Sequence, residues 1–145
     1  MAIEGEYDRD NIFAKILRGD APSVKVHEDE HGLAIMDLFP QSKGHVLVLP
    51  KVEARNLFDI EQAALGRLIV SVQKISEAVK KALKPDGVRI MQFNGARAGQ
   101  TVFHIHFHII PVYEGVVVGA HASGKQADPL ELEDHAALIR KAIFA

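Results

Sequence analysis

The sequence predicts an α+β domain in which an antiparallel sheet of about five strands carries one long helix, with a short helix near each end of the chain. Three observations support this fold class. Short runs rich in β-branched residues recur between turn residues, as in antiparallel strands. One longer segment spaces its apolar residues by three and four, as in an amphipathic helix. The chain of 145 residues is long enough to form a single domain, 1–145, with a substantial core.

The first half of the chain is expected to contain the shorter elements. Asp10 is a suitable N-cap for a first helix, and Gly19 follows its last turn. Pro50 ends the third strand, because proline cannot donate a hydrogen bond to a strand ladder. These signals predict a helix over 11–18 and strands over 24–28, 33–37 and 45–49, the first two strands being joined as a hairpin.

The second half begins with the strongest helix signal. Asp59 and Gln62 form a capping-box pattern. Apolar residues then repeat at helical spacing up to Leu83, and the Pro85-Asp86-Gly87 sequence interrupts them. The remaining elements are expected to be a strand over 88–93, a loop over 94–100, a strand that contains 104–108, an irregular segment over 114–128, and a helix from Asp128-Pro129 to Ile143.

Composition and charge exclude several classes of protein. The chain has no cysteine, which excludes disulfides, thiolate metal ligands and thiol catalysis. Its formal net charge of −2 provides no basic surface for duplex nucleic acid. No apolar run approaches the roughly 18 residues of a membrane-spanning helix, and residues 1–10 lack the apolar region of a signal peptide. We therefore expect a cytoplasmic protein without a membrane partner.

Three histidines alternate with apolar residues in the segment His104-Ile105-His106-Phe107-His108. Alternate side chains of a strand point to opposite faces, so the three imidazoles would share one face and the apolar residues the other. The histidine face would then line a cleft on the side of the sheet that the long helix does not cover. Four histidines elsewhere are expected to be ordinary solvated or hydrogen-bonded residues, namely His27, His31, His121 and His135.

Two kinds of chemistry suit such a face. One is metal binding, for which Asp37 or His45 could join from another strand, but His104 and His108 would lie about 13 Å apart in an extended strand. That separation is too large for both to bind one zinc ion. The other is covalent catalysis, in which a neutral imidazole with one nitrogen held as N–H attacks phosphorus with its second nitrogen. The glycine-containing loop over 94–101 would supply donors for a phosphate, so we expect covalent catalysis and no metal site.

The histidine segment resembles the signature of the histidine-triad family of nucleotide-binding proteins, His-x-His-x-His followed by apolar residues. The resemblance extends well outside the signature and covers about residues 11–111, which leaves 114–145 as a C-terminal extension with a helix. The other matching segments are 11–17, 37–51, Asn94 and Gly99-Gln100-Thr101-Val102.

The resemblance implies a role for each matching residue. The implied catalytic residues are His106 as the nucleophile, His108 as the donor to the phosphate or leaving group, and His104 and His45 as their supports. The implied nucleotide-binding residues are Asp37 for the ribose, Ile12, Phe13, Ile16 and Leu38 for the base, and Asn94, Gly99, Gln100 and Thr101 for the phosphate or leaving group. Without the resemblance, Asp37 would be interpreted as a turn residue and the apolar residues as core.

The resemblance implies a bacterial-type nucleotidyl hydrolase that releases a purine nucleoside monophosphate from a phosphoramidate or phosphoanhydride through a nucleotidyl-histidine. It also implies a homodimer joined through sheet edges and long helices, and no cofactor. The lack of cysteine removes the structural zinc that many relatives bind near the first helix. Val112 follows Pro111 where relatives acting on dinucleoside polyphosphates often have a basic residue, which weakens the assignment to a dinucleoside polyphosphate hydrolase. The histidines are also compatible with a nucleotide-binding regulator or scaffold whose turnover is incidental, and with a histidine-rich metal carrier.

Overall fold

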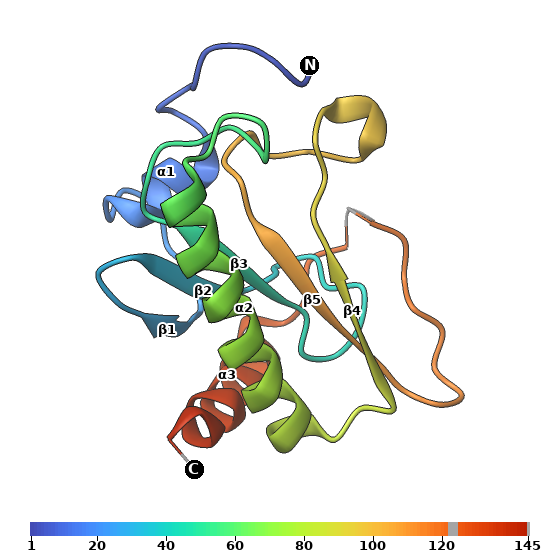
Figure 1. Ribbon diagram of the computed structural model, residues 1–145. Helices are drawn as coiled ribbons and strands as arrows, with labels where there is room; N and C mark the ends of the chain where they lie inside the picture. The colour runs from blue at the N-terminus through green and yellow to red at the C-terminus, as the bar shows by residue number, and fades with distance from the viewer. Residues whose placement is uncertain (122–124, 145) are drawn as a thin grey trace.

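A five-stranded antiparallel sheet in the order β1-β2-β3-β5-β4 forms the centre of the protein (Figure 1). The structure is a computed structural model and describes residues 1–121 and 125–144. Its strands are β1 (Lys25–Glu28), β2 (Gly32–Met36), β3 (Val46–Pro50), β4 (Gly87–Met91) and β5 (Phe107–Val112). Its helices are α1 (Ile12–Leu17), α2 (Gln62–Leu83), the short 3-10 helix η1 (Ala96–Ala98) and α3 (Pro129–Ile143). The predicted α+β class is confirmed, and no helix within the described ranges has the length and apolar character needed to cross a bilayer.

Helices α2 and α3 pack on one face of the sheet, and α1 packs on the other (Figure 1). The alternation of strand side chains separates the two cores. On β3, Val48 belongs to the core under α2, whereas Leu47 belongs to a smaller core under α1. His108 of β5 pairs with Leu47 and Ile109 lies in the α2 core. His108 therefore lies on the face that α2 leaves open, as the alternation predicts.

The caps of the two shorter helices follow from side-chain oxygens near their first turns. Asn11, and not the expected Asp10, caps α1 by accepting a hydrogen bond from the backbone N–H of Ala14. Asp128 caps α3 as predicted, because its carboxylate accepts from the backbone N–H of Leu130.

The capping box expected at the start of α2 is wrong. Glu61 occupies the N-cap position of α2 and makes no side-chain cap hydrogen bond. The Asp59 carboxylate instead accepts hydrogen bonds from the backbone N–H groups of Arg55 and Asn56. Asp59 thus stabilises the loop before the helix, and its carboxylate is not used to cap α2.

The histidine segment enters the sheet later than predicted. Strand β5 begins at Phe107, and its pairing with β3 ends at the pair Val48 and Phe107. Upstream, the backbone N–H of Ile105 donates to the carbonyl of Ala54, in the loop that follows β3. A continuous strand over 104–108 is therefore wrong for its first three residues, because the chain leaves the ladder to follow this loop.

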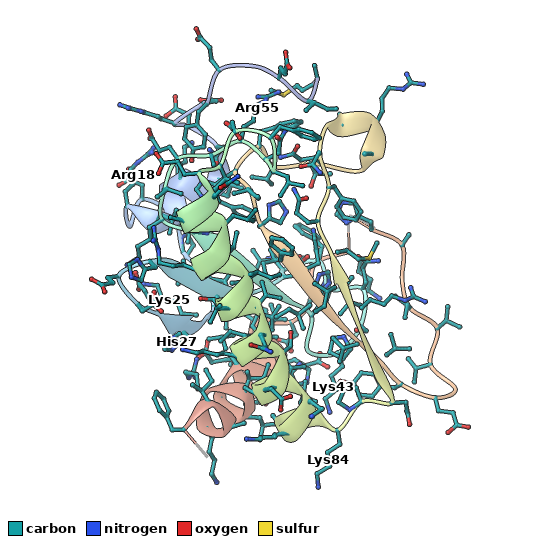
Figure 2. The ribbon with its side chains drawn as sticks, viewed as in Figure 1. Arg18, Lys25, His27, Lys43, Arg55 and Lys84 are labelled. Carbon is teal, nitrogen blue, oxygen red and sulfur yellow. The ribbon has the colours of Figure 1, made fainter. Side chains whose placement is uncertain are left out.

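The N-terminal segment, residues 1–10, is held against the loops that follow β3 and β4. Arg55 is only 3% exposed, and its guanidinium donates to the carbonyls of Ala2, Ile3 and Glu6. Figure 2 shows this side chain directly beside the N-terminal segment. A buried guanidinium satisfied by three carbonyls fixes the path of the segment, although the sequence offered no sign of it.

Candidate active site

A cavity of about 330 Å³ opens on the face of the sheet that carries α1. Its apolar lining consists of Ile12, Phe13, Ile16, Pro22, Ile35, Met36, Leu38, Phe39, Leu47 and Val102. Its polar lining consists of Ser23, Asp37, Thr101, His106, His108 and His121. An apolar wall with a few convergent polar groups is typical of a small-molecule site.

His106 presents a free ring nitrogen in this cavity. Its Nδ1 lies 2.7 Å from the backbone carbonyl oxygen of His104. Because a carbonyl oxygen only accepts, Nδ1 carries the hydrogen, and the neutral ring keeps its lone pair on Nε2. The edge of the ring packs against Phe13, with 4.8 Å between ring centroids. Burial lowers the pKa of His106 to about 4, partly opposed by the hydrogen bond to His104, so the ring is neutral at pH 7.

His45 and His108 are hydrogen-bonded to each other, and a backbone N–H determines which nitrogen of each ring carries the hydrogen. The backbone N–H of Gln41 donates to Nδ1 of His45, so the neutral His45 ring carries its hydrogen on Nε2. That nitrogen lies 2.9 Å from Nδ1 of His108 and donates to it. The hydrogen of His108 must then sit on Nε2, a buried atom that has no hydrogen-bond partner among the described residues. His108 thus offers an unsatisfied N–H donor beside His106. The centroids of the two rings are 5.0 Å apart.

Burial keeps the rings of His45 and His108 neutral. It lowers the pKa of His45 to about 3 and that of His108 to about 2, and nearby histidines add to both shifts. The donor on His108 is therefore fixed by its tautomer and not by an added proton.

Asp37 follows the last residue of β2 and lies at the rim of the cavity. One carboxylate oxygen accepts from the backbone N–H of Phe39, and the other lies 3.4 Å from Nε2 of His45. Burial raises the pKa of Asp37 above its ordinary value, opposed by this backbone hydrogen bond. Ligand atoms of Asp37, His45 and His108 all lie within 4.8 Å of one another, so a metal ion could be held there. The hydrogen bonds just described occupy the same atoms, and the absence of a metal site stays a prediction.

His104 supports the site from behind the cavity and is not one of its lining residues. Its Nε2 lies 2.8 Å from the carbonyl oxygen of Pro50 and so carries the hydrogen. Its Nδ1 accepts from the hydroxyl of Tyr7 at 2.5 Å. Both ring nitrogens of this fully buried histidine are therefore satisfied, and its carbonyl is free to hold His106.

The variant Tyr7→Phe should lower the free energy of unfolding by about 1–3 kcal/mol, because it leaves the buried Nδ1 of His104 without a donor. Urea denaturation followed by circular dichroism measures the change. Tyr113→Phe is the matched control, since the Tyr113 hydroxyl donates to the exposed carbonyl of Lys43. An equal loss in both variants would show that the Tyr7 hydroxyl contributes nothing specific to His104.

The loop that precedes the histidines is used differently from the expectation. Gln100 is 3% exposed, and its amide bonds the backbone of Arg55, Gly95 and Val102. The side chain of Asn94 accepts from the backbone N–H of Leu57 and pairs with Gln92. Gln100 and Asn94 therefore hold the loop and do not line the cavity, as Gly99 also does not, whereas Thr101 does. In this structure the Gln100 amide bonds the backbone and the Asn94 amide bonds Leu57 and Gln92, and the phosphate contacts expected of both residues stay predictions.

Sequence reasoning missed His121, which it grouped with the ordinary histidines. Its ring lines the cavity, and its Nε2 donates to the carbonyl of Gly99 at 2.7 Å. The ring packs edge-on against His108, with 5.2 Å between centroids. No spacing signal links residue 121 to the triad, because the contact is made by a segment without helix or strand that returns across the site.

The site can perform nucleophilic substitution at phosphorus. It holds a neutral imidazole with a free Nε2, a neighbouring unpaired N–H donor, and a carboxylate at the edge of an apolar wall. The donor suits a phosphoryl oxygen, and the carboxylate suits the paired hydroxyls of a sugar.

The sequence matches a described family model and several named proteins. The family model described as "HIT domain" matches residues 18–115. "Protein hit" of Bacillus subtilis is 40% identical over 125 residues, which are 83% of this chain and 86% of that protein. "Adenosine 5'-monophosphoramidase hnt1" of Schizosaccharomyces pombe is 41% identical over 100 residues, 69% of this chain and 72% of that protein. "Adenylylsulfatase HINT3" of Arabidopsis thaliana is 40% identical over 102 residues, 70% of this chain and 52% of that protein.

A solved structure also matches nearly the whole chain. The Hit-like protein of Bartonella henselae, described as involved in cell-cycle regulation and solved with an unknown ligand, has a TM-score of 0.90 and 47% identity. The match covers 95% of this chain and 99% of that one.

Proposed function

The chain belongs to the HIT domain family, and from this premise we propose that it is a nucleotidyl hydrolase. The substrate is a phosphoramidate or phosphoanhydride of a purine nucleoside monophosphate, and the reaction passes through a nucleotidyl-histidine on His106. The observation that carries this proposal is the lone pair on Nε2 of His106, held in the cavity beside the unpaired N–H of His108.

The reaction has two steps that use the same atoms. Nε2 of His106 attacks phosphorus, the bond from phosphorus to the leaving group breaks, and the leaving group takes up a proton from solvent. Water then attacks phosphorus, the bond to Nε2 breaks, and a proton returns to solvent. The N–H of His108 donates to a non-bridging oxygen whose charge grows in both transition states. Imidazole and water suffice for this chemistry, and we expect no cofactor.

The nucleoside occupies the rest of the cavity in this proposal. Asp37 accepts hydrogen bonds from the ribose hydroxyls, and the base lies against Phe13, Leu38 and their apolar neighbours. An adenine nucleotide is the first choice of probe, because the names of two relatives, an adenosine 5'-monophosphoramidase and an adenylylsulfatase, both specify adenylyl substrates.

Trapping the adduct tests the proposal directly. The protein is mixed with adenosine 5'-phosphoramidate, quenched within milliseconds to seconds, and analysed by intact-mass spectrometry and peptide mapping. We expect a mass increase of one adenylyl group on His106, present also after treatment with EDTA. Steady release of AMP without any adduct would contradict the covalent mechanism, and nucleotide binding without turnover would favour the regulator or scaffold. Activity lost with EDTA and restored by zinc would favour a metal site at Asp37, His45 and His108.

The proposed assembly is a homodimer joined through β4 and α2. Strand β4 lies at the edge of the sheet, and three apolar side chains there, Ile90 on β4 and Ile69 and Val70 on α2, are 44–48% exposed. An edge strand next to exposed apolar residues on a neighbouring helix is a surface that a second copy can cover. The three residues also line a shallow groove together with Gln73.

The double variant Ile69→Glu, Ile90→Glu should convert the dimer to monomer, because two like charges would be buried in one groove at the interface. Sedimentation velocity at micromolar concentration measures the change, with twice the 15.9 kDa chain mass expected for the natural protein. Leu138→Glu, on the exposed side of α3, is the control and should leave the dimer intact. A natural protein that sediments as a monomer would refute the proposed dimer.

A further inference from the structure

We infer that His121 contacts the leaving group of the substrate and favours leaving groups that carry N–H, so that the enzyme prefers phosphoramidates to oxygen esters of the same nucleotide. This inference rests on the proposed function. It concerns a residue that lies outside the triad and outside the matched family model, which ends at residue 115.

The position of His121 is fixed from two sides. The backbone N–H of Gly119 donates to the carbonyl of Gln41, and the side-chain amide of Gln41 donates back to the carbonyl of Gly119. Nε2 of His121 donates to Gly99, and its ring packs on Phe93 with 4.9 Å between centroids. The segment therefore connects the loop that holds His45 with the loop that precedes the triad. Its histidine is held in place and is not a free surface side chain.

Four rings that line the cavity are in successive contact. The distances between ring centroids are 4.8 Å from Phe13 to His106, 5.0 Å from His106 to His108, and 5.2 Å from His108 to His121. In the proposed function the base lies at the Phe13 end and phosphorus lies at His106. The group on the far side of phosphorus from the nucleoside then extends toward His121.

The hydrogen bond of His121 to Gly99 decides what the ring can offer. Because Nε2 carries the hydrogen that is donated to a carbonyl, Nδ1 is the ring nitrogen that can accept. Its lone pair accepts from an N–H of the leaving amine, and accepts more strongly once the nitrogen has been protonated by solvent for its departure. The ester oxygen of an aryl leaving group carries no hydrogen while it is bonded to phosphorus, so it gains nothing from this contact.

The test compares two substrates that give the same adduct, adenosine 5'-phosphoramidate and the 4-nitrophenyl ester of AMP. Rate constants for formation and hydrolysis of the adduct are measured by single turnover at pH 8, where imidazoles are largely neutral. The variant His121→Gln keeps an amide N–H for Gly99 and removes the Nδ1 acceptor. We expect it to slow adduct formation from the phosphoramidate about tenfold relative to the ester, which corresponds to about 1.4 kcal/mol. Hydrolysis of the adduct should change less than twofold, since the leaving group has departed.

The variant His121→Asn provides the complementary result. It gives up the Gly99 hydrogen bond and keeps an oxygen acceptor near the position of Nδ1, so it should retain the natural preference for the phosphoramidate. Equal slowing of both substrates by His121→Gln, or a change confined to adduct hydrolysis, would overturn the inference and assign His121 a structural role. A natural protein that forms no adduct with either substrate would refute the proposed function instead, so the two failures are distinguishable.

Discussion

The variant His106→Asn should lose the adenylyl adduct and release AMP about 10⁴-fold more slowly than the natural protein, as expected when a covalent nucleophile is removed. Asparagine is the informative replacement because its amide nitrogen lies near the position of Nδ1. It can keep the hydrogen bond to the carbonyl of His104 while it removes the lone pair of Nε2. The loss would then report on chemistry and not on collapse of the loop.

Two measurements complete this prediction. Calorimetric titration with AMP should give an affinity within a few-fold of the natural value, because Asp37 and the apolar wall are untouched. His27→Asn, on the partly exposed strand β1, serves as the control and should keep full activity. Turnover retained by a folded His106→Asn protein would show that water attacks the substrate directly, and the covalent mechanism would have to be abandoned.

The parts of the fold that sequence periodicity controls were predictable. The long helix, the hairpin of β1 and β2, and the start of α3 at Asp128 all follow from local spacing and capping chemistry. The open face of the sheet was predictable as well, because Ile109 and His108 must point to opposite sides of β5. Register in a half-buried sheet is determined by which face is apolar.

The hydrogen bonds that hold the site residues in place were not predictable, because they join segments that are distant in the sequence. Tyr7 reaches His104 across 97 positions of sequence, and His121 reaches Gly99 from a segment with no periodic pattern. Gln100 has the same donors and acceptors whether it faces a phosphate or the loop backbone. Only the arrangement around Arg55 decides that its amide is used internally. Resemblance to a family could supply roles for the cavity residues, but it could not say which polar side chains are already satisfied.

Acid should unfold this protein at a mildly acidic pH, with about 6 kcal/mol of stability lost between pH 7 and pH 5. His45, His106 and His108 have pKa values of about 3, 4 and 2 in the folded state, whereas an unfolded histidine titrates near 6.5. Their folded pKa values are depressed, so the unfolded chain binds more protons between these limits. Stability is therefore complete above about pH 6.5 and falls as the pH decreases.

The slope of the free energy of unfolding against pH depends on the number of histidines that are neutral in the folded protein. Each neutral buried histidine contributes about 1.4 kcal/mol per pH unit, so these three contribute about 4 kcal/mol per unit between roughly pH 6 and pH 5. Burial also lowers the pKa of His104 and His135, and both shifts act in the same direction. Asp37 acts in the opposite direction, because its raised pKa means that the folded state holds a proton more tightly than the unfolded chain. Its effect lies between its ordinary pKa and its raised pKa, and a single group does not reverse the trend set by several histidines. Since typical domains are stable by only about 5–15 kcal/mol, the loss is a large share of the total.

Urea denaturation at pH 7, 6 and 5 measures the slope, and His108→Asn tests its origin. The variant removes one of these rings, so its slope should fall by about 1.4 kcal/mol per pH unit, whatever its stability at pH 7. A solvated nucleophile would lose activity near pH 6.5, but His106 stays neutral to about pH 4 while the fold persists. The acid limit of activity should therefore coincide with unfolding and show a steeper pH dependence than a single protonation allows. A stability that is flat from pH 7 to pH 5 would mean that these rings take up protons in the folded protein as readily as in the unfolded chain, and the neutral nucleophile would lose its physical basis.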